Sequence, residues 1–183
     1  MEKMQQIDRK QEIIQTTWDY MKKHGLMNSS VGTLCKETGL AQSSLYHWFS
    51  NKEDVWISAG KYGLAKVVTK LFDYTFSHTD DIAGFFIGFL DEVDKYKDEL
   101  RLAIQITTSP LFGERMREKS RSFRIFYQQY ADKLMEKFGV SEVQANVFIY
   151  SVIAIVMDYV IWDDKDLAQM LLDNLHKRVT KAI

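Results

Sequence analysis

The sequence contains few residues that break or cross-link a chain. It has one proline and nine glycines in 183 residues, and because these residue types interrupt helices, their scarcity favours long helices. The single cysteine, Cys35, has no partner for an internal disulfide. One unpaired cysteine is typical of a reducing compartment, so we expect a cytoplasmic protein.

Motifs for metal binding, cofactor binding and catalysis are also missing. The four histidines lack the spacing of metal ligands. There is no glycine-rich phosphate loop, and neither Ser43 nor Ser44 lies in a G-x-S-x-G nucleophile motif. The N-terminus lacks the apolar run of a secretory signal. We therefore expect no metal, no cofactor, no signal peptide and no enzymatic activity.

Charge of one sign is not in large excess. The whole chain carries a net charge of −1, but residues 1–52 hold seven basic and five acidic side chains, whereas the remainder holds 17 basic and 20 acidic ones. The N-terminal part is thus slightly positive and the rest slightly negative. This mild asymmetry permits nucleic-acid binding by the first part of the chain but does not by itself indicate it.

The hydrophobic pattern is helical throughout, and no alternating strand pattern is present. The sequence predicts an all-α fold of about nine helices, over residues 7–24, 31–38, 41–48, 51–77, 79–93, 97–108, 111–138, 141–162 and 163–181. A kink or short loop is expected near Gly113. We expect two domains: a three-helix helix-turn-helix domain at residues 1–52 and a helical domain at residues 53–183.

The segment 30–48 has the arrangement of a helix-turn-helix: a short helix, a turn at Gly39 and a second short helix. Its second helix begins with short polar side chains that can read base edges in the major groove. Hydroxyl, imidazole and ammonium groups follow, where they can hold phosphates. By spacing alone, two short helices around a glycine are also common in helical proteins that bind no DNA. The expected DNA-binding residues are Ser30, Thr33, Gln42, Ser43, Ser44, Tyr46, His47 and Lys52.

Residues 13–56 closely resemble the DNA-binding domain of the tetracycline-repressor-like (TetR) family of bacterial regulators. The matching positions are Ile13-Ile14, Gly25, Ser30-Val31, Leu34-Cys35, Gly39-Leu40, Leu45-Tyr46-His47-Trp48-Phe49 and Lys52-Glu53-Asp54-Val55. The resemblance implies a homodimer that binds a partly palindromic DNA operator, and a ligand that alters DNA affinity. The choice of repressor over activator rests on the habit of the family.

The sequence departs from the family pattern at four places in this segment. Thr16 and Thr17 replace an alanine pair, and Thr38 stands where alanine is common. Ala41 replaces the serine that usually caps the recognition helix, which weakens the cap by about 1 kcal/mol. Gly32 stands where some members carry a base-contacting side chain, so base reading is expected to depend on residues 42–44.

The part of the chain after residue 60 is rich in aromatic side chains. Large aromatic residues between helices can line an apolar pocket with a few polar groups, although core packing is the more common role of any single one. We expect a ligand pocket, for an effector of unknown identity, that draws on Phe86, Phe89, Phe126, Tyr127 and Tyr130.

Residues 145–162 are apolar on nearly all sides. The run approaches the length of a membrane span, but Asp158 interrupts it and acidic residues follow it, which disfavours a membrane helix. A helix buried on one side by its own core and on the other by a partner subunit fits better. The expected dimer interface comprises Phe148, Val152, Ile153, Val156, Leu167, Met170, Leu171 and Leu175.

The sequence thus indicates a ligand-responsive transcriptional regulator. Two alternatives remain open at this stage. The helix-turn-helix could serve as a protein-interaction module with no DNA target, or the helical body could be a small enzyme. The polar first turn of the second helix disfavours the first alternative, and the missing catalytic motifs disfavour the second.

Overall fold

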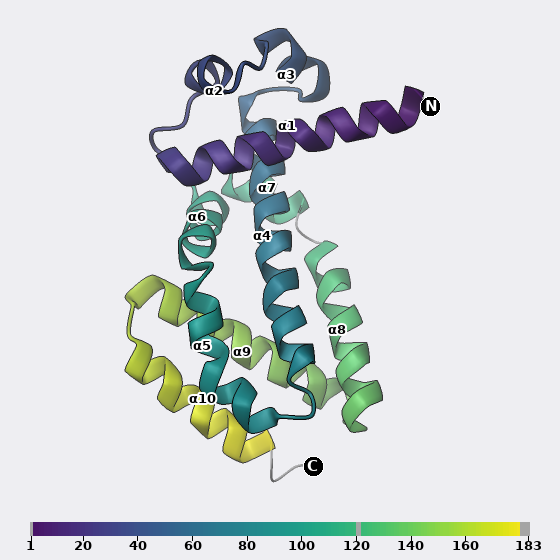
Figure 1. Cartoon of the computed structure of the whole chain (residues 1–183), viewed down its shortest axis with the longest axis vertical. Coiled ribbons are helices and arrows are strands. Elements are labelled where there is room, and N and C mark those ends of the chain that lie inside the picture. The colour runs from purple at the N-terminus through teal and green to yellow at the C-terminus, as the bar shows by residue number, and fades with distance from the viewer. Residues whose placement is uncertain (1, 120–121, 180–183) are drawn as a thin grey trace. The chain divides into compact units, whose positions relative to one another are not determined.

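The computed structural model describes residues 2–119 and 122–179, with side chains for residues 9–118 and 127–178. Every regular element in these ranges is an α-helix, which confirms the expected all-α fold. Figure 1 shows the helices in chain order. Their bounds are α1 (Glu2–His24), α2 (Val31–Thr38), α3 (Gln42–Trp48), α4 (Lys52–Ser77), α5 (Ile82–Asp94), α6 (Lys97–Thr108), α7 (Gly113–Lys119), α8 (Ser122–Phe138), α9 (Glu142–Trp162) and α10 (Lys165–Val179).

The helix boundaries agree with the sequence-based ones to within about three residues except in two regions, while the expected end of the last helix at residue 181 lies outside the described residues. Helix α1 begins at Glu2, several residues before the expected start. The single segment expected over residues 111–138 is described as two helices, α7 and α8, on either side of residues 120–121. The described residues therefore form ten helices instead of about nine.

Side-chain caps begin several of the helices at the expected places. The Ser30 hydroxyl accepts a hydrogen bond from the amide of Thr33 at 3.2 Å, at the start of α2. The Asp81 carboxylate accepts one from the amide of Gly84 at 2.9 Å, at the start of α5. Ser141 forms a complete capping box at the start of α9, as its S-x-x-Q sequence predicts.

The chain divides into two compact units, formed by residues 1–67 with 98–120 and by residues 68–97 with 121–183. The expected domain division at residue 52 remains a prediction. Helices α6 and α7 belong to the same compact unit as the helix-turn-helix, although they are distant from it in sequence. The hydrophobic pattern shows that these helices have apolar faces but not which partner each face covers.

The first unit has one core beneath the helix-turn-helix. Its buried members come from α1 (Ile13, Trp18, Met21), α2 and α3 (Leu34, Leu45), the N-terminal half of α4 (Val55, Ile57), α6 (Ile106) and α7 (Met116). Leu40, Leu45 and Phe49 are also buried in this core. Helix α1 crosses the N-terminal half of α4 (Figure 1). The short helices α2 and α3 are thus fixed by burial of one face each.

The second unit is built around α9, which packs against α8 on one side and α10 on the other, while α10 also packs against α5 (Figure 1). A polar network joins the ends of these helices. The Tyr159 hydroxyl donates to Asp94 at 2.5 Å, and the Lys165 ammonium donates to Asp91 and Asp94, each at 2.7 Å. Lys97 also pairs with Asp163.

Helix α9 is long and apolar enough to cross a membrane by length and composition alone, with a mean hydropathy of 1.8 over its most apolar window. The core helix of a globular protein passes the same test. Its packing against both α8 and α10 is that of a helix buried on more than one side.

Candidate functional site

Helix α3 turns one face into the core and the other toward solvent. Leu45 is fully buried, whereas Gln42, Ser43, Tyr46 and His47 are exposed and Ser44 is half-buried. The exposed side chains start in the first turn of the helix, which is the part that reaches base edges when such a helix lies in the major groove. The first unit therefore presents a solvent-exposed helix face that carries hydrogen-bonding side chains.

The structure also shows that α3 lacks a side-chain cap. Ala41 has the extended backbone of an N-cap residue, with φ −72° and ψ 135°, but offers no side-chain acceptor. The amide of Ser44 instead donates to the carbonyl of Ala41 at 3.0 Å. This confirms the weakened cap expected from the sequence.

Ser30 and Thr33 use their hydroxyl groups within the first unit. The Thr33 hydroxyl lies 2.8 Å from the Ser30 hydroxyl and donates to the carbonyl of Ser30 at 3.1 Å. Tyr20 of α1 also shares a hydrogen bond with Thr33. The bonds between Ser30 and Thr33 fix the start of α2, and the bond to Tyr20 ties α2 to α1. Ser30 and Thr33 therefore have a structural role whether or not they also contact DNA.

Positive groups border the exposed face of α3. Lys52, at the start of α4, is exposed, and its Nζ lies 4.0 Å from the Glu53 carboxylate, a loose contact. Lys10 of α1, which sequence reasoning did not single out, lies 5.3 Å from the ring centre of Phe49, the residue that ends α3. Only the tertiary packing of α1 brings Lys10 beside the recognition helix, and no motif marks it.

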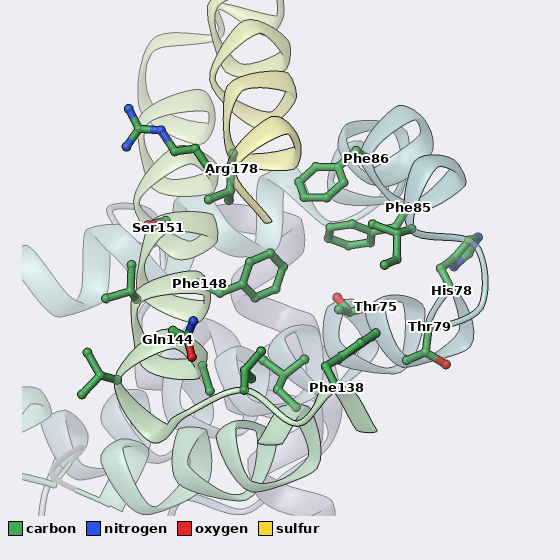
Figure 2. A pocket seen from close by; sticks show the side chains of 17 residues that line it. Thr75, His78, Thr79, Phe85, Phe86, Phe138, Gln144, Phe148, Ser151 and Arg178 are labelled. Carbon is green, nitrogen blue, oxygen red and sulfur yellow. The ribbon is translucent and has the colours of Figure 1, made fainter. Parts of the chain in front are cut away.

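The second unit contains a pocket of about 310 Å³, at the lower end of the range for small organic ligands. Its wall is formed by the C-terminal end of α4, the turn that follows it, α5, the end of α8, α9 and α10. The apolar lining residues are Ile82, Phe85, Phe86, Leu134, Phe138, Val140, Val143, Ala145, Val147, Phe148 and Leu175. Figure 2 shows Phe148 of α9 pointing toward Phe85 and Phe86 of α5, and both ring-centre separations are 6.4 Å.

Six polar residues complete the pocket wall, and several are already engaged. The Thr75 hydroxyl donates to the carbonyl of Leu71 at 2.9 Å. The Gln144 side-chain oxygen accepts from the amide of Ser141 at 2.8 Å. Because eleven of its 17 lining residues are apolar, the pocket suits a mainly apolar molecule. The polar lining residues are Thr75, His78, Thr79, Gln144, Ser151 and Arg178.

Of the aromatic residues expected in the pocket, the structure places Phe86 in its wall. Phe89 is buried 4.8 Å from the Phe85 ring centre but does not line the pocket. Tyr130 stacks on Phe72 of α4 at 3.6 Å, and burial raises the pKa of Tyr127 to about 12. These three residues belong to the packed core of the second unit. The side chain of Phe126 lies outside the described residues.

The residues that line the pocket without having been expected come mostly from the end of α8, the α8–α9 connection and α9. Phe138, Val140 and Gln144 are far in sequence from Phe85 and Phe86. Periodicity predicted the helices that carry them, but a pocket between helices depends on how those helices cross. The only sequence signal near these residues was the capping box of Ser141 and Gln144, and it indicates the start of a helix but not a pocket.

The expected dimer residues divide into four groups in the structure. Leu167, Met170 and Leu171 of α10 are exposed. Phe148 and Leu175 line the pocket, while Val152 and Ile153 are half-buried. Val156 is 6% exposed, so it belongs to the core of its own subunit. Six large apolar residues of α9 that were not expected are also exposed: Val143, Val147, Tyr150, Met157, Ile161 and Trp162.

The part of the chain that the structure describes contains no cluster of three or more histidine, cysteine, aspartate or glutamate side chains that could hold a metal ion. Cys35 is half-buried on α2 against the core of the first unit, and burial raises the pKa of its thiol. A raised thiol pKa disfavours the reactive thiolate.

Comparison with known proteins identifies one region of similarity. Residues 13–58 match the family model described as bacterial regulatory proteins, tetR family. No curated protein and no solved structure matches the chain. The matched segment runs from α1 through α2 and α3 into the first turns of α4 and so includes the whole helix-turn-helix.

Proposed function

Because this chain belongs to the tetR family of bacterial regulatory proteins, and so is a DNA-binding transcriptional regulator, we propose that it acts as a ligand-responsive repressor. In this proposal a homodimer binds a partly palindromic operator in the cytoplasm, and a small apolar molecule in the second unit weakens that binding. The observation that carries the proposal is the exposed polar face of α3, set on a fully buried Leu45.

The proposed division of work on the DNA follows from side-chain chemistry. The Gln42 amide and the hydroxyls of Ser43 and Ser44 can donate to and accept from base edges, and glutamine suits adenine. Tyr46, His47 and Lys52 offer donors to phosphates, which fix the register of the protein without reading sequence. Lys10 joins this second group because it is exposed beside the end of α3.

The proposed effector is a small molecule whose surface is mostly apolar. The support for it is the 310 Å³ pocket with eleven apolar residues among the 17 that line it. Because most of the lining residues are apolar, we expect shape and apolar contact to provide most of the affinity and the polar lining residues to provide orientation. Repression follows the habit of the family; an effector that strengthens operator binding would reverse the sign of control.

The proposed dimer uses the exposed apolar faces of α9 and α10. Large apolar side chains are exposed along both helices, and exposed apolar surface that is continuous in this way is unusual for a monomer. Two helices from each subunit can form a four-helix bundle about a two-fold axis. The same axis presents two recognition helices to successive major grooves of a palindromic operator, about 34–36 Å apart.

Binding to DNA is the test of the proposed function. Duplexes selected from a random library by the parent protein provide an operator, and anisotropy titrations then compare three alanine variants. Gln42→Ala should reduce discrimination at particular base positions by about 1–3 kcal/mol. Lys52→Ala should weaken binding to all sequences alike and reduce the log–log salt slope by about one.

Lys70→Ala provides the control, because Lys70 is exposed on the part of α4 that belongs to the second unit. It should bind as the parent does. Failure of the parent to select any sequence would remove the proposed role and favour a protein-interaction module. An equal loss on operator and random DNA for Gln42→Ala would remove base reading by that residue.

A further inference from the structure

The pocket of the second unit and the exposed face of α9 share residues. Val143 and Val147 line the pocket, yet they are 72% and 59% exposed. A lining residue that is mostly exposed marks a place where the wall of the pocket is open to solvent. The pocket therefore lacks part of its wall in a single subunit, on the side where the proposed dimer contact lies.

The exposed apolar residues of α9 form a regular row, which we call the α9 seam. Its members are Val143, Val147, Tyr150, Ala154, Met157 and Ile161. The intervals along the seam are alternately four and three residues, which is the 3.5-residue repeat of helices that pack along each other. The stretch from Val143 to Met157 contains no charged side chain, so burying it against another helix desolvates no charge.

The spacing of the seam is symmetric about position 152. An antiparallel copy of α9 centred there sets Val143 opposite Ile161 of the partner subunit, Val147 opposite the partner's Met157 and Tyr150 opposite the partner's Ala154. Such a contact uses one patch on both subunits, as a two-fold axis requires. It also sets the largest seam residue opposite the smallest, which allows close packing.

We propose that the partner subunit closes the ligand pocket. In the antiparallel register, the partner's Met157 and Ile161 cover Val147 and Val143, so each pocket is completed by the C-terminal half of the other subunit's α9. The inference rests on the proposed dimer and adds the register and the composition of the site. The ligand is then a small apolar molecule enclosed by both subunits. Dimer formation should therefore increase the affinity for the ligand, and the ligand should increase the affinity of the two subunits for each other by the same factor.

Closure is tested by the accessibility of a thiol in the pocket wall. Phe148→Cys in a Cys35→Ser background places a reporter there, and its rate of reaction with 5,5′-dithiobis(2-nitrobenzoic acid) is measured at concentrations above and below dimer dissociation. A second comparison uses the same reporter with Ile161→Glu, a charge in the seam that should give a monomer. The dimer should react about tenfold more slowly or slower still, because a covered thiol reacts only when the cover opens.

Two matched reporters accompany the test. Ser151→Cys, also in the pocket wall, replaces Phe148→Cys if removal of the phenyl ring disturbs folding. Ile87→Cys, on α5 at a position that is 75% exposed and not in the seam, should react equally fast in monomer and dimer. Equal rates for the pocket reporters in monomer and dimer would overturn the closure.

The register has its own test. Val147→Cys with Met157→Cys, again without Cys35, should form a disulfide between subunits under mild oxidation, because facing positions bring the Cβ atoms close enough. Val147→Cys alone should not. A dimer by sedimentation that forms no such disulfide overturns the register while leaving the proposed function intact. A chain that remains monomeric at all concentrations overturns both the closure and the proposed dimer.

Discussion

Gly63 of α4 lies directly against the indole of Trp18 in the first unit. A Cβ atom at position 63 would come within 2.1 Å of the Trp18 ring, and Trp18 is 1% exposed, so its ring has no free space to move into. We expect Gly63→Ala to lower the free energy of unfolding by about 1–3 kcal/mol through overpacking. Chemical denaturation of the full chain measures the change.

Gly32 provides the matched control for this substitution. It also lies in a helix, but a Cβ atom there would meet only the Ser30 hydroxyl, at 4.0 Å. Gly32→Ala should be neutral or should stabilise the protein by up to about 1 kcal/mol, because alanine favours helix more than glycine does. If Gly63→Ala and Gly32→Ala changed stability alike, the tight packing of α1 on α4 would be contradicted.

Asp94 links stability to pH in the second unit. Burial opposes ionisation of its carboxyl, but hydrogen bonds from Lys165 and Tyr159 and the charges of Lys165 and Lys97 outweigh burial, so the pKa of Asp94 lies below its usual value. Because the pKa is lower in the folded state, the ionised carboxylate stabilises the fold above its unfolded pKa of about 4. This stabilisation is lost as pH falls through the folded pKa.

Asp94→Asn should therefore lower the free energy of unfolding at pH 7. The gap between the variant and the parent should narrow as pH falls from about 5 toward 3, and urea unfolding at each pH gives both values. Asp98→Asn, at an exposed carboxylate with only a 3.7 Å contact to Arg101, should change stability little. A gap that stayed constant down to the acid limit would show that Asp94 acts by packing and not by charge.

Among the helices, α3 differs from α2 in how its first turn is held. Its N-cap is Ala41, without a side-chain acceptor, whereas α2 has the Ser30 cap. Ala41→Ser should increase the stability of the full chain by about 1 kcal/mol, and Ser30→Ala should reduce it by a similar amount. Thermal unfolding followed by circular dichroism measures both. No gain from Ala41→Ser would mean that the first turn of α3 is held by its buried Leu45 alone.

For the whole molecule, we expect a glutamate substituted on the buried side of α9 and one substituted on its exposed side to have different effects. Val156 faces its own core at 6% exposure, whereas Ile161 is 51% exposed in the seam. Val156→Glu should unfold the subunit because it buries an unpaired carboxylate. Ile161→Glu should leave the subunit folded but should dissociate the proposed dimer. Circular dichroism and sedimentation velocity at micromolar concentration separate the two results.

Operator binding completes this prediction. The folded Ile161→Glu monomer should bind the selected operator at least about tenfold more weakly than the parent, because it loses the second linked half-site contact. Ile87→Glu, with its charge on an exposed position of α5, should match the parent in both assays. A folded monomer that bound the operator as tightly as the parent would contradict the dimeric mode.

The helix ends and the helix-turn-helix of this protein could be predicted from the sequence alone. Helix starts at Ser30, Asp81 and Ser141, helix ends at glycines 25, 39 and 139 with positive φ, and the helix-turn-helix all depend on groups within a few residues of one another. Because these interactions join residues that are close in sequence, the sequence alone is enough to predict them. The residues of α3 that face solvent were predictable for the same reason, since one short amphipathic helix has only one apolar side.

Tertiary structure alone decided which side chains line the pocket and which face of α9 points outward. Helix α9 is apolar on nearly all sides, so its periodicity does not distinguish the buried Val156 from the exposed Ile161. In the same way, composition predicted a pocket lined by Phe86, Phe89 and Tyr130, whereas in the structure Phe86 lines it and the other two fill the core. These outcomes depend on how helices that are distant in sequence cross each other. A helix that is apolar on all sides can bury apolar surface at more than one crossing angle, so its sequence does not select one.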